Sequence, residues 1–157
     1  MDHRILKASA ADHQTLSNIA YKAKGYWGYP AEWLKLWKDD LTISPQLITD
    51  NDTWKLMIGE EIIGFTIIIT HPDDTCEIEH CWISPDYIGK GYGGKLLTHA
   101  LAQPQYTQKH FNVLADPNAV HFYRKFGFKT IKEIPGKPEG RLLPWMEMVN
   151  QIVSTDL

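Results

Sequence analysis

The sequence predicts one domain of the mixed α+β class, and three observations lead to this prediction. The chain has 157 residues, which fits a single domain of ordinary size, so residues 1–157 are treated as one unit. Short β-branched runs separated by turn residues follow one another from residue 53, which is typical of an antiparallel meander. A later strand–helix–strand order needs a crossover connection and therefore predicts a parallel pair of strands.

The first fifty residues predict a strand followed by two helices. Residues 3–8 read as a short strand, and apolar residues between positions 12 and 24 recur at the spacing of one helix face. The segment GYWGYP then ends this helix. Pro30 suits the first turn of a second helix, since its missing N–H group would have no helical partner there.

The rest of the chain predicts at least six further elements. Three strands are expected in TWKLMI, IIGFTIIIT and CEIEHCWI, and strict alternation in the last run places Cys76 and Cys81 on opposite faces as free thiols. A helix around residues 96–101 and the buried strand FNVLA follow. Ala119–Phe126 predicts another amphipathic helix, and two last strands are expected at roughly 128–134 and 142–149.

Composition argues against several classes of function. A net charge of −3 gives no general attraction to nucleic acid, which usually requires a basic face. No stretch approaches the ~20 apolar residues of a membrane helix, and the N-terminus lacks the pattern of a signal peptide, so we expect a cytoplasmic protein without membrane contacts. His80 and Cys81 lack a second ligand pair at zinc-like spacing, so no metal is expected.

A glycine-rich turn between a strand and a helix, Gly89–Gly94, predicts an anion site. Such a turn brings backbone N–H groups and the start of a helix close to a phosphate. A nucleoside triphosphate loop is one interpretation, because Gly89, Gly94 and Lys95 have the required spacing. Leu96 stands where that motif needs a hydroxyl for magnesium, which argues against this interpretation.

Two other phosphate motifs overlap on the same residues. The dinucleotide fingerprint is formally met by Gly89, Gly91 and Gly94, with Asp116 downstream at a suitable distance for a ribose. Its context is wrong, because residues 85–88 separate the strand from the glycines and antiparallel strands come before it. The third interpretation is a cradle for the pyrophosphate of coenzyme A.

Two motifs resemble the GNAT superfamily of acyl-CoA-dependent N-acyltransferases. ISP at residues 83–85 and IGKGYG at residues 88–93 are similar to that family's strand end and phosphate turn, although Ile88 replaces the usual Arg or Gln. DPNAVHFYRKFGF at residues 116–128 is similar to its second motif. The resemblance covers residues 53–128 and implies a GNAT-like mixed sheet of six to seven strands, with the central parallel pair splayed for coenzyme A and helices on both faces.

The resemblance implies an N-acetyltransferase that moves the acetyl group of acetyl-CoA to an amine of a small molecule or protein. Attack would be direct, within a ternary complex of a monomer or homodimer. The alternative is a non-catalytic domain that binds or senses acyl-CoA. Residues implied to contact the coenzyme are Trp82, Ile83, Ser84, Ile88, Gly89, Lys90, Gly91, Tyr92, Gly93, Gly94, Lys95, Asn118 and Tyr123.

Three of the candidate residues would carry the chemistry. By resemblance, Glu79 is the first candidate for the base and Glu77 the second, both on the same strand face as Ile83 if alternation holds. Tyr123 would protonate the coenzyme A sulfur or hold it by a hydrogen bond, and a main-chain N–H at Trp82 or Ile83 would meet the oxyanion. The opposing interpretations are solvated strand charges for the two glutamates and a core role for Tyr123.

The acceptor amine is expected beside an aromatic wall. In the family this pocket lies between the N-terminal helices and the splayed strands, where aromatic ring faces can hold an ammonium group. Alternatively, the rings pack the helices against the sheet. The residues concerned are Tyr21, Tyr26, Trp27, Tyr29 and Trp33.

Overall fold

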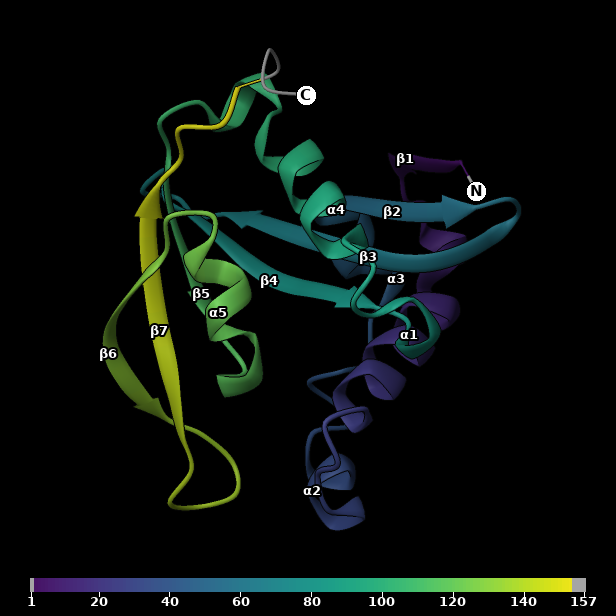
Figure 1. Cartoon of the computed structure of the whole chain (residues 1–157), viewed down its shortest axis with the longest axis vertical. Coiled ribbons are helices and arrows are strands. Elements are labelled where there is room, and N and C mark those ends of the chain that lie inside the picture. The colour runs from purple at the N-terminus through teal and green to yellow at the C-terminus, as the bar shows by residue number, and fades with distance from the viewer. Residues whose placement is uncertain (1, 154–157) are drawn as a thin grey trace.

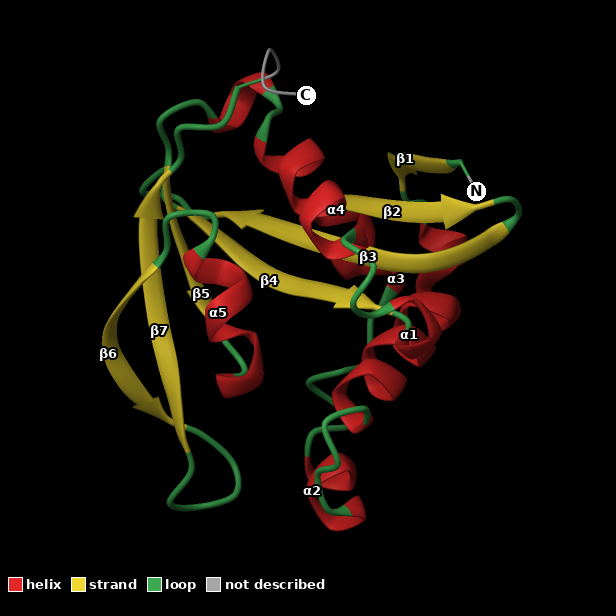
Figure 2. Ribbon diagram, viewed as in Figure 1, coloured by secondary structure: helices red, strands yellow, loops and turns green. Residues whose placement is uncertain are grey.

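A single seven-stranded sheet organises the chain, seen in a computed structural model that describes residues 2–153 (Figures 1 and 2). The strands lie in the order β1-β2-β3-β4-β5-β7-β6, and only the pair β4–β5 is parallel. This confirms the mixed α+β class and the parallel pair. The strands are β1 (His3–Lys7), β2 (Asp52–Ile58), β3 (Glu61–Thr70), β4 (Cys76–Ile83), β5 (His110–Leu114), β6 (Lys129–Pro135) and β7 (Leu142–Val149).

Helices cover both faces of the sheet, as expected. One face packs against α1 (His13–Gly25), α2 (Ala31–Leu36) and α3 (Pro45–Asp50). The opposite face packs against α4 (Tyr92–Leu101) and α5 (Val120–Arg124). Within the described residues no helix is long and apolar enough to cross a membrane.

Helix α3 was not predicted from the sequence. The Ser44 side chain accepts a hydrogen bond from the N–H of Leu47 at 3.0 Å, and Pro45 occupies the first turn. These are the usual signals of a helix start. The helix has only six residues and buries one of them, Ile48, so the sequence shows too few apolar positions to establish a period.

The two parallel strands separate soon after they meet. Only two residue pairs join β4 and β5, namely Cys76 with Phe111 and Glu77 with Asn112. On its other edge β4 stays paired with β3 as far as Ile83, opposite Gly64. The C-terminal half of β4 therefore has an edge without a neighbouring strand, and we call this opening the fork.

A one-residue bulge at Glu79 breaks the alternation of β4. Ile67 pairs with His80 and Ile68 with Ile78, so Glu79 is the extra residue. Cys76 and Ile78 pack in the cluster beneath α4 and α5, and Cys81 packs against the same cluster. The prediction that the two cysteines face opposite sides is therefore wrong, although both are free thiols as expected.

The same bulge corrects the predicted orientation of the two glutamates. Ile83 packs with Leu96 of α4. Glu77 alternates with Cys76 and Ile78, so its side chain lies on the opposite face, the one that carries α1. Glu79 approaches Glu77 closely enough for a hydrogen bond and therefore belongs to that face too.

Candidate functional site

The glycine turn leads from the end of β4 into α4. Gly89 and Gly91 have φ angles of +83° and +84°, in the left-handed region that residues with side chains rarely adopt. The N–H of Lys95 donates to the carbonyl oxygen of Gly91 at 3.2 Å. The N–H groups of the three residues before Lys95 therefore have no acceptor inside the helix, and they lie at its positive end.

A hollow of about 540 Å³ lies beside this turn. Gly91, Gly94 and Lys95 line it from the turn and α4, and His3 and Ile5 line it from β1. The Lys90 and Lys95 side chains are exposed at the same place. This arrangement offers main-chain N–H groups and positive charge to a polyanion such as a diphosphate.

A pair of carboxyl groups lies at the base of the fork on the α1 face. Burial, together with the negative charge and hydrogen bond of Glu77, raises the pKa of Glu79 to about 7, although part of the Glu79 side chain reaches solvent. His71 Nε2 lies 2.9 Å from a carboxyl oxygen of Glu77. Glu79 therefore exchanges a proton near neutral pH, as a general base should.

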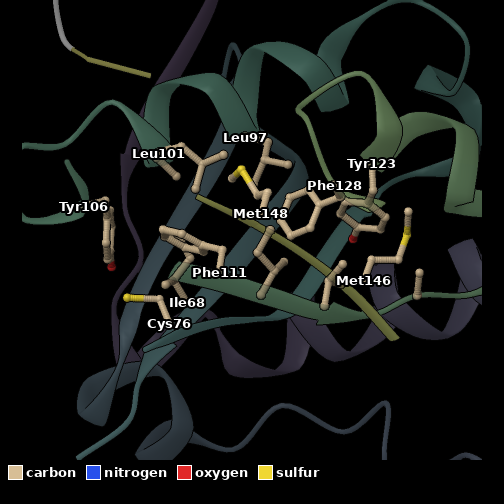
Figure 3. Close-up of a cluster of buried hydrophobic side chains, with 14 residues drawn as sticks. Ile68, Cys76, Leu97, Leu101, Tyr106, Phe111, Tyr123, Phe128, Met146 and Met148 are labelled. Atoms are coloured by element: carbon tan, nitrogen blue, oxygen red, sulfur yellow. The ribbon is translucent and has the colours of Figure 1, made fainter. Parts of the chain in front are cut away.

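Tyr123 lies on the other face, between α5 and the fork (Figure 3). Its ring packs edge-on against Phe122 and Phe128, with centroids 5.1 and 5.6 Å away. Burial raises the pKa of Tyr123 well above its usual value, and Cys81 of β4 and Asp116 after β5 raise it further. Tyr123 therefore belongs to the core, in a cluster to which Cys81 of β4 and Val113 of β5 also contribute.

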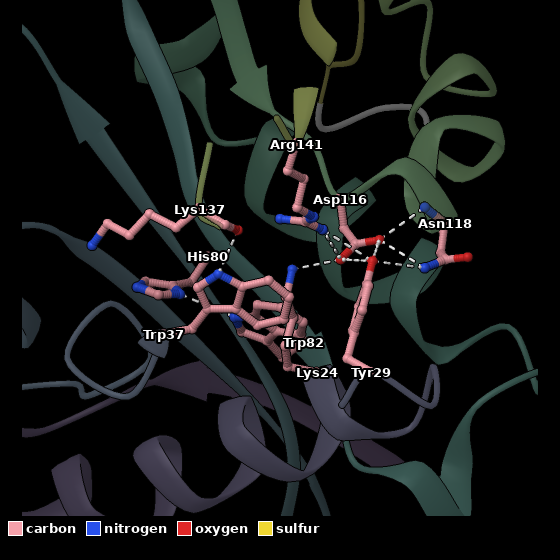
Figure 4. Close-up of polar contacts among 9 residues, drawn as sticks. All are labelled: Lys24, Tyr29, Trp37, His80, Trp82, Asp116, Asn118, Lys137 and Arg141. Atoms are coloured by element: carbon pink, nitrogen blue, oxygen red, sulfur yellow. Dashed lines mark hydrogen bonds and ion pairs between the residues drawn. The ribbon is translucent and has the colours of Figure 1, made fainter. Parts of the chain in front are cut away.

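Beyond β5, Asp116 accepts hydrogen bonds from several elements (Figure 4). Lys24 Nζ lies 2.5 Å away, the Tyr29 hydroxyl 3.0 Å, and the N–H of Asn118 2.8 Å. The Arg141 guanidinium is 3.6 Å from the same carboxylate and donates to the Tyr29 hydroxyl at 3.0 Å. Burial alone would raise the pKa of Asp116, but Lys24 and these hydrogen bonds hold it below its usual value.

Aromatic rings enclose the Lys24 ammonium. Its Nζ lies 4.6 Å from the ring centroid of Trp37, 5.3 Å from that of Tyr29 and 5.9 Å from that of Trp82. Burial lowers the pKa of Lys24, and the neighbouring carboxylate opposes this effect. We name the group formed by Lys24, Tyr29, Trp37, Asp116 and Arg141 the Lys24 cluster.

The residues predicted to form an aromatic wall for the acceptor amine lie in separate places, and one of them belongs to the Lys24 cluster. Tyr29 belongs to the cluster, and Trp33 stacks on it with centroids 5.9 Å apart. Tyr26 and Trp27 pair edge-on with each other and are 51% and 42% exposed. Tyr21 lines a separate groove between α1 and the α2–α3 segment. The five predicted residues therefore do not form one wall.

The predicted coenzyme contacts other than Tyr123 fall into two groups. Residues 82–95 lie along the end of β4, the turn and the start of α4, where the N–H of Ser84 still pairs with the carbonyl oxygen of Ile63 at 2.7 Å. Asn118 instead lies with the Lys24 cluster, where its Nδ2 donates to Tyr29 at 3.1 Å and to Asp116 at 3.0 Å.

Sequence reasoning missed Lys24 and Arg141. Lys24 follows Leu16 and Ala20 at intervals of four, so it continues the buried face of α1, and a charged residue at such a position is a readable signal. Arg141 comes from the β6–β7 turn, 112 residues after Tyr29, and nothing in the local sequence indicates this contact.

A family model for the acetyltransferase (GNAT) domain matches residues 49–130, more than half of the chain. Among solved structures, PaiA N-acetyltransferase from Thermoplasma acidophilum, in complex with coenzyme A, is 20% identical with a TM-score of 0.72, covering 95% of this chain and 99% of that chain. A GCN5-related N-acetyltransferase from Rhodopseudomonas palustris is 19% identical with a TM-score of 0.77, covering 95% and 96%.

A third similar structure is the ribosomal-protein-S18-alanine N-acetyltransferase from Escherichia coli, which is 17% identical with a TM-score of 0.67. That alignment covers 99% of both chains. Similarity at these identities shows a shared fold. A sequence comparison with curated proteins gives no significant match.

Replacing Asp116 with Asn should lower the free energy of unfolding by about 3 kcal/mol, because two buried cations would lose their carboxylate. The side chains of Lys24 and Arg141 are only 11% exposed. Urea denaturation measures this change. The matched control is Asp40→Asn, which removes an exposed ion pair with Lys137 and should cost less than about 1 kcal/mol. Equal losses in the two variants would contradict the buried character of the Lys24 cluster.

Proposed function

Because the chain belongs to the GNAT acetyltransferase family and is therefore an acyltransferase, we propose that it moves the acetyl group of acetyl-CoA to an amine by direct attack in a ternary complex. One observation carries this proposal: the fork runs along the C-terminal half of β4, and the glycine turn follows the end of the same strand. An extended thioester arm fits beside an unpaired strand edge, and a diphosphate fits at unpaired N–H groups.

The residues of the turn suit the diphosphate of coenzyme A. Main-chain N–H groups of Tyr92, Gly93 and Gly94 would bind it, with Lys90 and Lys95 near its outer oxygens. Neither Gly89 nor Gly91 carries a side chain that would obstruct this approach, and their φ angles exclude most replacements. Ile88, in place of the family's polar residue, leaves these main-chain groups unchanged.

In this proposal the acid and the base lie on opposite sides of the sheet at the fork. A thioester lying in the opening would have the Tyr123 hydroxyl on the α5 side and the Glu79 carboxylate on the α1 side. The amine therefore approaches from the α1 face. This geometry suits direct attack, since the amine can add to one face of the planar thioester carbonyl while the acid reaches the sulfur from the other side of the sheet.

The reaction then needs two proton transfers and one charge stabilisation. The amine nitrogen forms a bond to the acetyl carbon while the carbon–sulfur bond breaks, and Glu79, assisted by Glu77, accepts the proton that the amine loses. Tyr123 keeps its proton because its pKa is raised, and it gives that proton or a hydrogen bond to the departing thiolate. A main-chain N–H of Trp82 or Ile83 on the free edge of β4 meets the oxyanion.

Replacing Gly91 with Val should weaken coenzyme A binding at least tenfold, because a β-branched residue resists a φ of +84° and its side chain would lie against the diphosphate. Isothermal calorimetry with coenzyme A measures the affinity. Gly59→Val is the matched control, since Gly59 has a φ of +59° in the turn after β2, away from the cradle. Unchanged affinity in Gly91→Val would place the diphosphate elsewhere.

Replacing Tyr123 with Phe should lower kcat on the order of 100-fold, the usual contribution of a general acid, with coenzyme A affinity nearly unchanged. Thiol release from acetyl-CoA measures turnover. Tyr106→Phe removes another buried phenol from the same cluster, one that donates to Asp52 at 2.6 Å, and it should alter stability without altering turnover. Full activity in Tyr123→Phe would remove the hydroxyl from the mechanism.

The rate should rise with pH through about 7, because Glu79 acts only when ionised and its pKa is raised to about 7. Glu79→Gln should remove this limb of the profile for kcat/KM and lower the rate on the order of 100-fold. Glu77→Gln should shift the limb to lower pH, because the charge that helps raise the Glu79 pKa is gone. A limb that stays in place in both variants would exclude Glu79 as the base.

A further inference from the structure

A row of polar residues crosses three strands on the α1 face, beside the fork. Asn112 of β5 pairs in register with Glu77 of β4 and with Glu147 of β7. Phe111 and Val113 pack into the cluster on the opposite face, so the Asn112 side chain points to the α1 face. With strands about 4.8 Å apart, the two glutamates begin roughly 10 Å apart at the backbone.

The amide of Asn112 lies unpaired in the middle of this row. Its side chain is 9% exposed, and within residues 2–153 its Nδ2 is buried without a hydrogen-bond partner. Buried amides are nearly always hydrogen-bonded, so an unpaired one beside an opening indicates a group that arrives with a ligand. Rotation of the amide by about 180° offers its oxygen instead of its nitrogen, so it can serve either a donor or an acceptor.

The surroundings of the row are acidic. Glu79 lies next to Glu77, and Asp40 at the end of α2 is close enough to raise the pKa of Glu79. The Trp145 indole N–H donates to a Glu147 carboxyl oxygen at 2.7 Å. Lys129 lies opposite Glu147 in register.

Positive charge offsets only part of this acidity. Lys137 already pairs with Asp40 at 3.5 Å, and His71 is bonded to Glu77. Lys132 Nζ lies 5.4 Å from the ring centroid of Trp145, so four carboxyl groups face three lysines and the imidazole of His71. The surface around the row favours a ligand with more than one positive charge.

Resting on the proposed function, we propose that the acceptor is a linear aliphatic diamine or polyamine lying across β5. One nitrogen lies at Glu79 and attacks the thioester, and a second, still protonated, binds Glu147. A central nitrogen of a longer chain would lie over Asn112. A monoamine with an apolar tail would leave the Asn112 amide without a partner and would place an alkyl chain against the Glu147 carboxylate.

A matched pair of substrates tests this inference. We compare kcat/KM for 1,5-diaminopentane and 1-aminopentane, measured by thiol release at saturating acetyl-CoA, because the two differ only in the second ammonium. The diamine should be favoured about tenfold, mainly through a lower KM, as expected for a contact made equally in the ground and transition states. The preference should shrink as salt screens the charges.

Glu147→Gln should reduce the diamine-to-monoamine ratio several-fold. Glu60→Gln, which changes an exposed glutamate in the β2–β3 turn, should leave the ratio unchanged. A wild-type ratio near one, or a full preference retained in Glu147→Gln, would overturn the inference while leaving acetyl transfer intact. If neither amine releases thiol, the proposed function fails instead. Calorimetry with 1,5-diaminopentane then decides, since heat that Glu147→Gln removes supports the diamine site and no heat refutes it.

Discussion

The separation of β4 from β5 after two residue pairs is the constraint on which the rest of the structure depends. On either side of this separation the sheet is antiparallel. β4 pairs with β3 and β5 pairs with β7, so each of the two parallel strands is paired along one edge. The other edges carry main-chain groups that cannot stay buried and unpaired. In the proposed function an extended thioester arm lies in the fork beside these groups, and the glycine turn at the end of β4 binds the charged end of the coenzyme.

Since only two residue pairs join the two halves of the sheet, other contacts must hold their relative position. The Lys24 cluster does this, because it joins the end of α1, the residue after β5 and the β6–β7 turn. Trp37 adds a hydrogen bond of 2.9 Å from its indole N–H to the carbonyl oxygen of Lys137. Buried ion pairs contribute little net stability compared with apolar packing, but losing one partner is costly. The cluster thus favours one width of the fork over others.

The sequence was sufficient to predict the order of the strands and of the helices other than α3, the parallel pair and the glycine turn, because each rests on local spacing. It could not predict the bulge at Glu79, since nothing in CEIEHCWI marks an extra residue; only pairing with β3 shows it. Because of this single residue, Glu77 lies on the face opposite Ile83, and Cys81 lies on the same face as Cys76. Arg141 was not predicted for a related reason. Its contact with Tyr29 depends on the assembly of the whole sheet and not on a local sequence pattern.

Tyr29, one of the aromatic residues expected to hold a substrate ammonium, already holds one that belongs to the chain. The rings of Tyr29, Trp37 and Trp82 surround Lys24, and Asp116 neutralises it. A second ammonium at that place would face both Lys24 and Arg141, and like charges in a buried site repel strongly. The α1 face of β4 is an alternative place for the amine. The bulge leaves Glu77 and Glu79 together on this face, beside Asn112 and Glu147. In the proposed function, attraction for the amine therefore comes from carboxylates of β4 and β7, on the side of the fork from which the amine approaches the thioester.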